Sequence, residues 1–214
     1  RFKLAMNCSA EMIFVVTLSE HLSGSYQSAV LGKQLYEEEY GGDHKKILII
    51  PSNSAAAGQY RLVVALERMC KLNFSFEQIK EKIFYLRNQM KTYFVLESLE
   101  TLRKNGRLSG LSAFFASALN IKPIMGASEG KIIKLDQARG MNRALAKMAE
   151  IATKEGENLP EKILCITHVN CPERAQFVAD HFKAMGICKE IFITEAMGVS
   201  TIYAGDGGIV IGFV

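Results

Sequence analysis

The sequence predicts an α/β fold of two domains: an N-terminal parallel, doubly wound sheet, expected to be truncated at its start, and a C-terminal α/β lobe with a mixed sheet. Three observations predict this fold. Continuous β-rich runs alternate with helical segments over residues 1–89, the order typical of parallel sheets. Two apolar runs flank Ser128-Glu129-Gly130, which is a hairpin pattern. Strands and helices then alternate again to residue 214.

The first domain is expected to begin with a buried strand. Met12–Leu18 is a continuous β-rich run, and Lys46–Pro51 is expected to be a second buried strand. Between them, small polar residues open a helix that is expected to run to Tyr40 and to stop at Gly41-Gly42. This order of elements favours parallel pairing of the two strands.

Two further helices complete residues 1–89. One is expected to run to about Cys70, with Ser52-Asn53-Ser54 as its cap, because serine and asparagine are preferred at helix starts. The other covers Phe76–Gln89 and has Ser75 as its cap.

The second domain, residues 90–214, has a different pattern of elements. The expected strands are Thr92–Glu97, Ile121–Ala127, Lys131–Leu135, Ile163–His168, Ile191–Glu195 and Gly208–Val214, and the expected helices are Leu99–Lys104, Ser109–Leu119, Ala138–Lys154 and Pro172–Met185. A hairpin within such a series predicts the mixed sheet.

Composition excludes several classes of function. The formal net charge is only +4 and no basic stripe is interleaved with aromatic residues, so we expect no nucleic-acid partner. No apolar run reaches the roughly 18 residues of a membrane span, which leaves only transient membrane contact. The five cysteines form no CxxC pair, so we expect neither a disulfide framework nor a metal site. No signal peptide is visible, and a cytoplasmic location is expected.

The turn Ser23-Gly24-Ser25 is a candidate anion site. It follows a buried strand and precedes a helix, whose N-terminus carries about half a positive charge. Ligands of open α/β sheets lie beyond the carboxyl ends of the strands, where this turn is expected. The alternative is plain helix capping, for which serine is equally suited.

Two arginines stand at unusual positions. Arg107 follows a glycine turn, and Arg139 precedes Gly140 at the expected start of a long helix, where a cation opposes the helix dipole. Each is a candidate for binding, or else a solvated surface residue.

Signals for catalysis are weak. The chain contains no G-x-S-x-G elbow and no G-x-x-x-x-G-K-[ST] loop, and its four histidines show no recognisable spacing to serine or cysteine. We therefore expect a binding protein without a cofactor rather than an enzyme. Two alternatives stay open: an acyl or phosphoryl transferase with Ser23 as nucleophile, and an anion-sensing regulatory module.

Five segments together resemble the DegV family of bacterial fatty-acid-binding proteins. They occur in family order and cover almost the whole chain. The segments are Thr17–Ala29, Glu97–Ser109, Leu119–Ile124 with the hairpin after it, Ala138-Arg139-Gly140, and the terminal Gly-Ile-Val-Ile-Gly-Phe-Val of residues 208–214.

The resemblance implies that one long-chain fatty acid is enclosed between two domains and that its carboxylate lies near Ser23. It also implies a partner, a fatty acid kinase, with Arg107 and Arg139 as docking residues. The carrier would present the lipid to that kinase for phospholipid synthesis. Apolar candidates for the slot that holds the acyl chain are Phe114, Phe115, Ile121, Ile124 and Met125.

The sequence departs from the family pattern in two places. The opening strand and Asp-Ser turn of the family are not found before Met12. Where many relatives carry a His-Thr-Gly-Pro-Gly-like stretch, this chain has Tyr203-Ala-Gly-Asp-Gly207. Tyr203 can still donate a hydrogen bond to a ligand, whereas Asp206 adds a negative charge that disfavours a nearby carboxylate.

Overall fold

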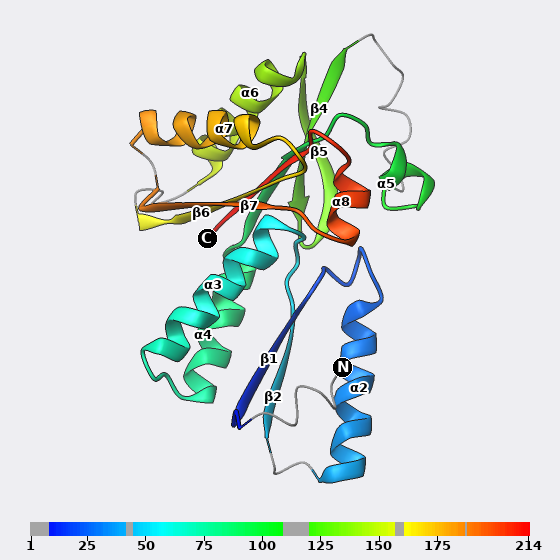
Figure 1. Cartoon of the computed structure of the whole chain (residues 1–214), viewed down its shortest axis with the longest axis vertical. Helices are drawn as coiled ribbons and strands as arrows, with labels where there is room; N and C mark the ends of the chain where they lie inside the picture. The colour runs from blue at the N-terminus through cyan, green and yellow to red at the C-terminus, as the bar shows by residue number, and fades with distance from the viewer. Residues whose placement is uncertain (1–8, 42–44, 109–119, 157–160, 187) are drawn as a thin grey trace.

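The α/β fold is confirmed in a computed structural model, which describes residues 9–41, 45–108, 120–156, 161–186 and 188–214. The described strands form two sheets that follow one another along the long axis of the molecule (Figure 1). One sheet has two strands and the other has six. No described helix is long and apolar enough to cross a membrane.

The two-stranded sheet pairs β1 (Met12–Thr17) with β2 (Lys46–Pro51) in parallel, as predicted. Side chains of β2 alternate between two small cores. Ile47 and Ile49 pack against α2 (Ser25–Tyr40). Leu48 and Ile50 pack against the pair of helices on the other face, α3 (Ala57–Lys71) and α4 (Phe76–Gln89). Burial on both faces explains why the strand sequence is continuously apolar.

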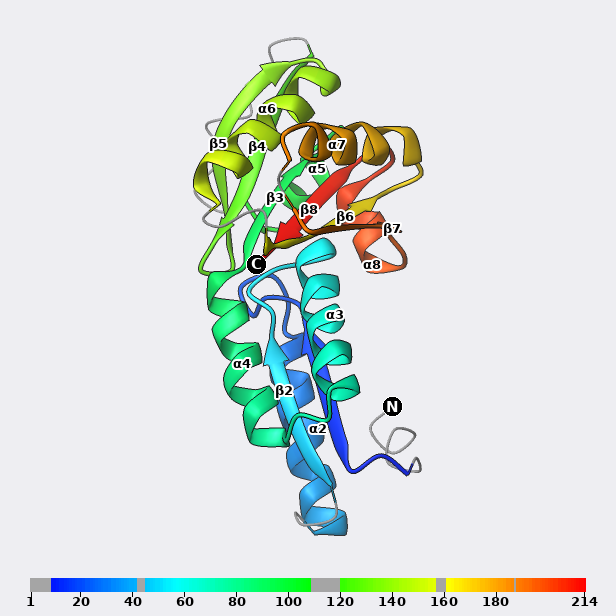
Figure 2. The same ribbon diagram turned by 90° about the vertical axis from the view of Figure 1, so that its left-hand side faces the viewer.

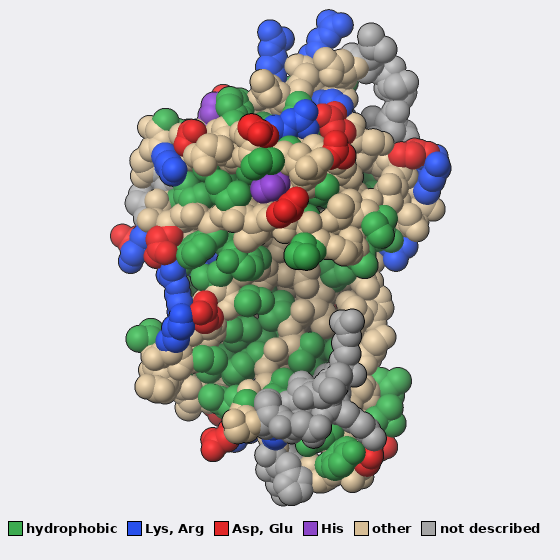
Figure 3. Space-filling model, in the orientation of Figure 1, with side chains coloured by type: hydrophobic (Ala, Val, Ile, Leu, Met, Phe, Trp, Pro, Cys, Tyr) green, Lys and Arg blue, Asp and Glu red, His purple; other side chains and the backbone are tan. Residues whose placement is uncertain are grey.

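The described part of β1 is less covered than β2. Its first five residues are only half-buried although all are apolar. Hydrophobic side chains accordingly gather on the surface of the lower part of the molecule, over β1 and the adjoining helices (Figure 3).

Two of the predicted helix boundaries are confirmed by their local geometry. α2 ends at Gly41, whose φ of 81° is accessible to glycine at little cost. α4 begins at a capping box, in which Ser75 Oγ accepts from Gln78 N at 3.3 Å and Gln78 Oε1 accepts from Ser75 N at 2.9 Å.

Replacing Ser75 with alanine is expected to lower the free energy of unfolding by about 1 kcal/mol, because the N-terminal N–H groups of α4 lose an acceptor. Urea denaturation followed by circular dichroism measures the change. Ser75→Asp is the control and should keep most of the stability, since aspartate also caps. Equal losses in the two variants would contradict the capping role.

The cap predicted for α3 is wrong. Its N-cap is Ala56, which has no side-chain cap. Ser52 Oγ donates instead to Ser54 O at 2.9 Å, and Ser54 Oγ lies 2.7 Å from Thr92 Oγ1 of the next sheet. The serines therefore hold the loop before α3 rather than the helix itself.

The six-stranded sheet has the order β5-β4-β3-β8-β6-β7. Only β6 and β7 pair in parallel, and the other neighbours are antiparallel. The strands are β3 (Lys91–Val95), β4 (Ile121–Ser128), β5 (Lys131–Arg139), β6 (Ile163–His168), β7 (Glu190–Glu195) and β8 (Ile209–Phe213). The predicted mixed sheet is thus confirmed, with the last strand at its centre.

The two faces of this sheet have different roles. α6 (Met141–Glu155) and α7 (Pro172–Ala184) cover the outer face and bury the largest apolar cluster (Figure 2). The other face carries a second cluster and is joined by α5 (Glu100–Lys104) and α8 (Val199–Ala204). This inner face turns toward the two-stranded sheet.

One predicted helix of this half needs correction, one helix was not predicted, and one prediction lies outside the described residues. The helix expected from Ala138 begins at Met141, because β5 continues to Arg139 and Gly140 then turns the chain with a φ of 82°. α8 has no counterpart among the predicted helices. The helix expected at 109–119 lies outside the described residues.

α3 connects the two sheets. Gly58 in its first turn packs so closely on Gly212 of β8 that a Cβ at Gly212 would lie 2.7 Å from Gly58 N. Further along the helix, Arg68 pairs with Glu190 of β7 at 2.7 Å. Arg61 is 6% exposed and donates to Val214 O at 3.3 Å, and burial lowers its pKa. α3 thus belongs to the N-terminal part of the chain but packs on both sheets. The domain boundary at residues 89–90 remains a prediction.

Candidate functional site

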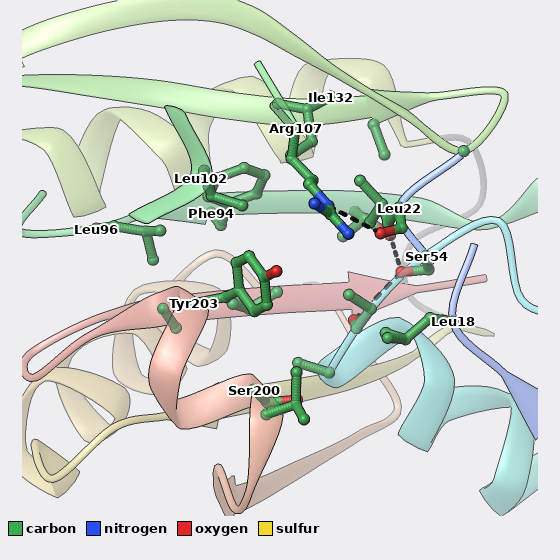
Figure 4. Close-up of a pocket in the computed structure, with 18 of the residues that line it drawn as sticks. Leu18, Leu22, Ser54, Phe94, Leu96, Leu102, Arg107, Ile132, Ser200 and Tyr203 are labelled. Carbon is green, nitrogen blue, oxygen red and sulfur yellow. Dashed lines mark hydrogen bonds between the residues drawn. The ribbon is translucent and has the colours of Figure 1, made fainter. Parts of the chain in front are cut away.

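A cavity of about 120 Å³ lies between the inner face of the six-stranded sheet and the loops after β1 and β2 (Figure 4). Most of its lining is apolar. The apolar lining residues are Leu18, Leu22, Ala55, Ala56, Phe94, Leu96, Leu102, Ala127, Ile132, Val199, Ala204 and Val210, and the others are Asn53, Ser54, Thr92, Arg107, Gly130, Ser200 and Tyr203. Such a lining suits a ligand with a long apolar portion.

Local structure explains why these side chains converge. Alternation along β3 turns Phe94 toward the cavity and Tyr93 toward the outer core, and Thr92 and Leu96 share the inward face. The loops after β1 and β2 lie at the carboxyl ends of parallel strands, where ligands of open α/β sheets bind. The cavity therefore lies where the sequence predicted a ligand site, beyond the carboxyl ends of the parallel strands.

Ser19 organises the loop after β1 and was not singled out from the sequence. Its carbonyl accepts from the N–H groups of Leu22 at 3.0 Å and Ser23 at 3.1 Å. Its hydroxyl is fully buried and donates to Gly130 O at 2.7 Å. Gly130 has a φ of 79°, and a Cβ there would lie 2.5 Å from Ser19 Oγ. The loop is thus fastened to the β4–β5 hairpin across 111 residues of sequence.

The turn Ser23-Gly24-Ser25 lies directly after Leu22, a cavity residue, but none of its three residues lines the cavity itself. Gly24 is the N-cap of α2, and Ser23 Oγ accepts from Ser25 N at 3.2 Å. The backbone N–H of Ser23 is already bonded to Ser19 O. Ser25 Oγ is buried without a hydrogen-bond partner among the described residues. The hydroxyl of Ser25 is therefore a donor that is left for an anion.

Arg107 and Tyr203 meet at the wall of the cavity (Figure 4). Arg107 Nε donates to Leu22 O at 3.1 Å, and its Nη1 donates to Asn105 O. The centre of the guanidinium lies 5.8 Å from the centroid of the Tyr203 ring, within the range of a cation–π contact. Both predicted residues are thus brought together with the Leu22–Ser23 turn.

The other predicted residues lie elsewhere. Arg139 is exposed at the end of β5. Ile124 is fully buried in the outer core and Met125 in the inner cluster, and neither these two nor Ile121 lines the cavity. Phe114 and Phe115 lie outside the described residues. The side chains that do line it, such as Phe94 and Ile132, are spread over elements far apart in sequence, which no local pattern reveals.

Two carboxylates lie near the cavity without lining it. Asp206 accepts from the neutral amide of Asn170, Nδ2 to Oδ1, at 3.0 Å. Glu97 accepts from Arg174 Nη2 at 2.8 Å and also pairs with Lys122. Although burial raises the pKa of Glu97, its bonds to the two cations outweigh this and leave the pKa below its ordinary value. The charge of Glu97 is therefore compensated by two cations, and neither carboxylate lines the cavity.

The described residues offer little for catalysis by Ser23. Its described hydrogen bond is the one from Ser25 N, and no imidazole or carboxylate within the described ranges bonds to its hydroxyl. His168 is buried, and its Nδ1 accepts from Cys171 N at 3.3 Å. The described chain also holds no group of three or more His, Cys, Asp or Glu residues that could bind a metal.

Comparisons with known proteins agree on one family. The family model described as "Uncharacterised protein, DegV family" matches residues 2–214. A DegV-family protein of Ruminococcus gnavus, refined with vaccenic acid, is 46% identical with a TM-score of 0.92, over 99% of this chain and 75% of that one. The fatty acid kinase (Fak) B3 protein of Streptococcus pneumoniae, loaded with linoleic acid, is 30% identical with a TM-score of 0.88, over 99% and 74%.

Sequence similarity alone gives the same result. A DegV domain-containing protein of Streptococcus pyogenes serotype M1 is 33% identical over 205 residues, which are 95% of this chain and 72% of that protein. The chain belongs to the DegV family.

Proposed function

We propose that this protein binds a long-chain fatty acid between its two sheets, with the acyl chain in the apolar cavity and the carboxylate at the Ser23–Ser25 turn. The observation that carries the proposal is the position of the cavity. Its lining is mostly apolar, yet one wall is Leu22, which leads directly into a turn with hydroxyl groups.

The energetics favour such a ligand. Each buried methylene contributes about 0.8 kcal/mol, so an acyl chain can drive binding without specific contacts. A buried carboxylate is costly unless donors surround it, and hydrogen bonds to charged groups are the strong ones. Ser23 and Ser25 supply hydroxyls, and Tyr203 supplies a third from the opposite wall.

The size of the cavity sets a condition on binding. Pockets that enclose drug-sized ligands hold roughly 300–1,000 Å³, and this cavity holds about 120 Å³. A long acyl chain must therefore displace side chains or extend beyond the space that is open here. α8 is one element that can yield, since it is six residues long and lies between Gly198 and Gly205, both with positive φ.

The second part of the proposal is that the protein acts as a carrier for the bound fatty acid. In this proposal the protein is cytoplasmic and presents the fatty acid to a fatty acid kinase, with Arg107 and Arg139 as docking residues, for phospholipid synthesis. Support comes from the linoleic acid-loaded Fak B3 relative, which is 30% identical. Co-purification of the protein with a fatty acid kinase, lost in an Arg139→Glu variant, tests this part separately from lipid binding.

Organic extraction of the purified protein, followed by mass spectrometry, tests lipid binding directly. We expect one fatty acid per chain, and a higher melting temperature when vaccenic acid is added to delipidated protein. Acetate is the matched control, because it has the same head group without the chain and should cause no shift.

Two results would contradict the proposal. One is recovery of no lipid together with no shift from vaccenic acid. The other is a shift caused by small phosphorylated compounds but not by vaccenic acid, which would favour the anion-sensing module.

A further inference from the structure

The end of the β4–β5 hairpin extends beyond the strand next to it. The hairpin lies at one edge of the six-stranded sheet, and its two strands pair along their whole length (Figure 2). β4 is in register with β3 at only two positions, Met125 and Gly126. The ladder between β4 and β5 also shifts register between Ile124 and Met125, an irregularity at which a strand can bend. Residues 127–132, here called the hairpin flap, therefore pair only with one another within the described part of the chain.

The hairpin flap forms one wall of the cavity. Ala127, Gly130 and Ile132 line the cavity, and the other three residues of the flap are exposed to solvent. One side of the flap thus faces the proposed ligand and the other faces water. Movement of the flap away from the cavity would connect the cavity to solvent.

The flap is held closed by one buried hydrogen bond. Ser19 Oγ is fully buried and donates to Gly130 O at 2.7 Å. Among the described residues, no other hydrogen bond or ion pair joins the flap to the loops after β1 and β2. A single hydrogen bond shifts an equilibrium by only about tenfold, so the flap can open without unfolding of the sheet.

The other walls of the cavity are held by more than one bond. β3 and β8 are inner strands of the six-stranded sheet. The loop after β2 is bonded on two sides, because Ser19 N donates to Ser54 O at 2.9 Å and Ser54 Oγ lies 2.7 Å from Thr92 Oγ1. The competing exit from the cavity is at α8.

We infer that the hairpin flap is the gate of the cavity, and that the fatty acid enters and leaves when the bond between Ser19 and Gly130 breaks. This rests on the proposed function and adds to it the route of exchange. Ser19 does not line the cavity, so it is a positioning residue that acts on the lipid through Gly130.

A reversible covalent lock tests the gate. A Cβ at Gly130 would lie 2.5 Å from Ser19 Oγ, so the two β-carbons come within the roughly 3.5–4.5 Å that a disulfide spans. The double variant Ser19→Cys/Gly130→Cys is loaded with vaccenic acid, treated with oxidised glutathione and mixed with phosphatidylcholine vesicles. We expect transfer of the lipid to the vesicles to stop while the disulfide is intact and to resume when dithiothreitol reduces it.

The lock carries its own control. Cysteine at position 130 has a cost in stability, because Gly130 has a φ of 79°, but this cost is common to the oxidised and the reduced protein. Wild-type protein given the same two treatments should transfer lipid at one rate throughout. Mass spectrometry of the unreduced protein identifies the disulfide.

The Ser19→Ala variant tests the same bond without a new cross-link. It removes the hydroxyl but keeps the Ser19 carbonyl that accepts from Leu22 and Ser23. We expect transfer to vesicles to be roughly 3- to 10-fold faster, as for one lost hydrogen bond. The dissociation constant should change less, since the lipid-free and the lipid-bound protein lose the same bond. Ser75→Ala is the matched control, because it weakens the cap of α4 far from the hairpin and should leave the transfer rate unchanged.

Each contrary outcome has a distinct meaning. Equal transfer by the oxidised and the reduced double variant would overturn the inference, leave fatty-acid binding intact and assign the exit to α8. An unchanged rate in Ser19→Ala, or an equal acceleration in Ser75→Ala, would also overturn it. Wild-type protein that binds no vaccenic acid would overturn the proposed function, and the inference with it.

Discussion

An Ala127→Phe variant is expected to lose most of its affinity for fatty acid. Ala127 lines the cavity from β4, close to the turn of the β4–β5 hairpin. A phenyl ring at this position would occupy space in a cavity of only about 120 Å³. If it excludes about four methylenes of the acyl chain, binding weakens by about 3 kcal/mol, or more than 100-fold.

Fluorescence displacement with a labelled fatty acid measures this loss. Ala127→Ser is the matched control, because it preserves the volume and should bind within a few-fold of wild type. The phenylalanine variant should also keep the wild-type unfolding midpoint in the absence of lipid, or rise above it, because a filled cavity gains contacts. Full lipid binding by Ala127→Phe would place the acyl chain outside this cavity.

A Gly212→Ala variant is expected to be the most destabilised of the glycine variants in the strands. Its Cβ would lie 2.7 Å from Gly58 N, 2.8 Å from Gly58 Cα and 3.0 Å from Ala57 C, and all three are backbone atoms of α3. A backbone cannot move aside as a side chain can, so α3 must shift from β8. Forcing atoms into a packed core costs about 1–3 kcal/mol.

Gly126→Ala provides the comparison in another strand of the same sheet, β4. Its Cβ would lie 2.8 Å from Leu135 Cδ1, the end of a flexible side chain that can rotate away. Urea denaturation should therefore show a clearly larger loss for Gly212→Ala than for Gly126→Ala. The Gly212 variant should also bind lipid more weakly, since the loop before α3 contributes Ala55 and Ala56 to the cavity. Equal stabilities would mean that α3 is not fixed by this contact.

Local patterns predicted much of the secondary structure. Buried-strand patterns identified β1 and β2, and Ser75 identified the start of α4. These features depend on residues close in sequence. The error at the start of α6 has a different cause. β5 extends to Arg139 because this residue pairs with Ile121 of β4, and that pairing depends on the strand partner rather than on local propensity.

The composition of the site could not be predicted in the same way. The bond from Arg107 to Leu22 spans 85 residues, and the bond from Ser19 to Gly130 spans 111. Neither has a signature in helical or strand periodicity. The sequence pointed to Ser23 and to Tyr203, but only the fold places Arg107 against the Tyr203 ring and fastens the loop of Ser23 through Ser19.

A crystal structure of the protein with bound vaccenic acid tests the central claim most directly. The account predicts the acyl chain between the two sheets, in contact with Phe94 and Ile132. It also predicts the carboxylate within hydrogen-bond distance of Ser23. An acyl chain bound outside the cavity, or a carboxylate at the opposite end with Ser23 uncontacted, would contradict it.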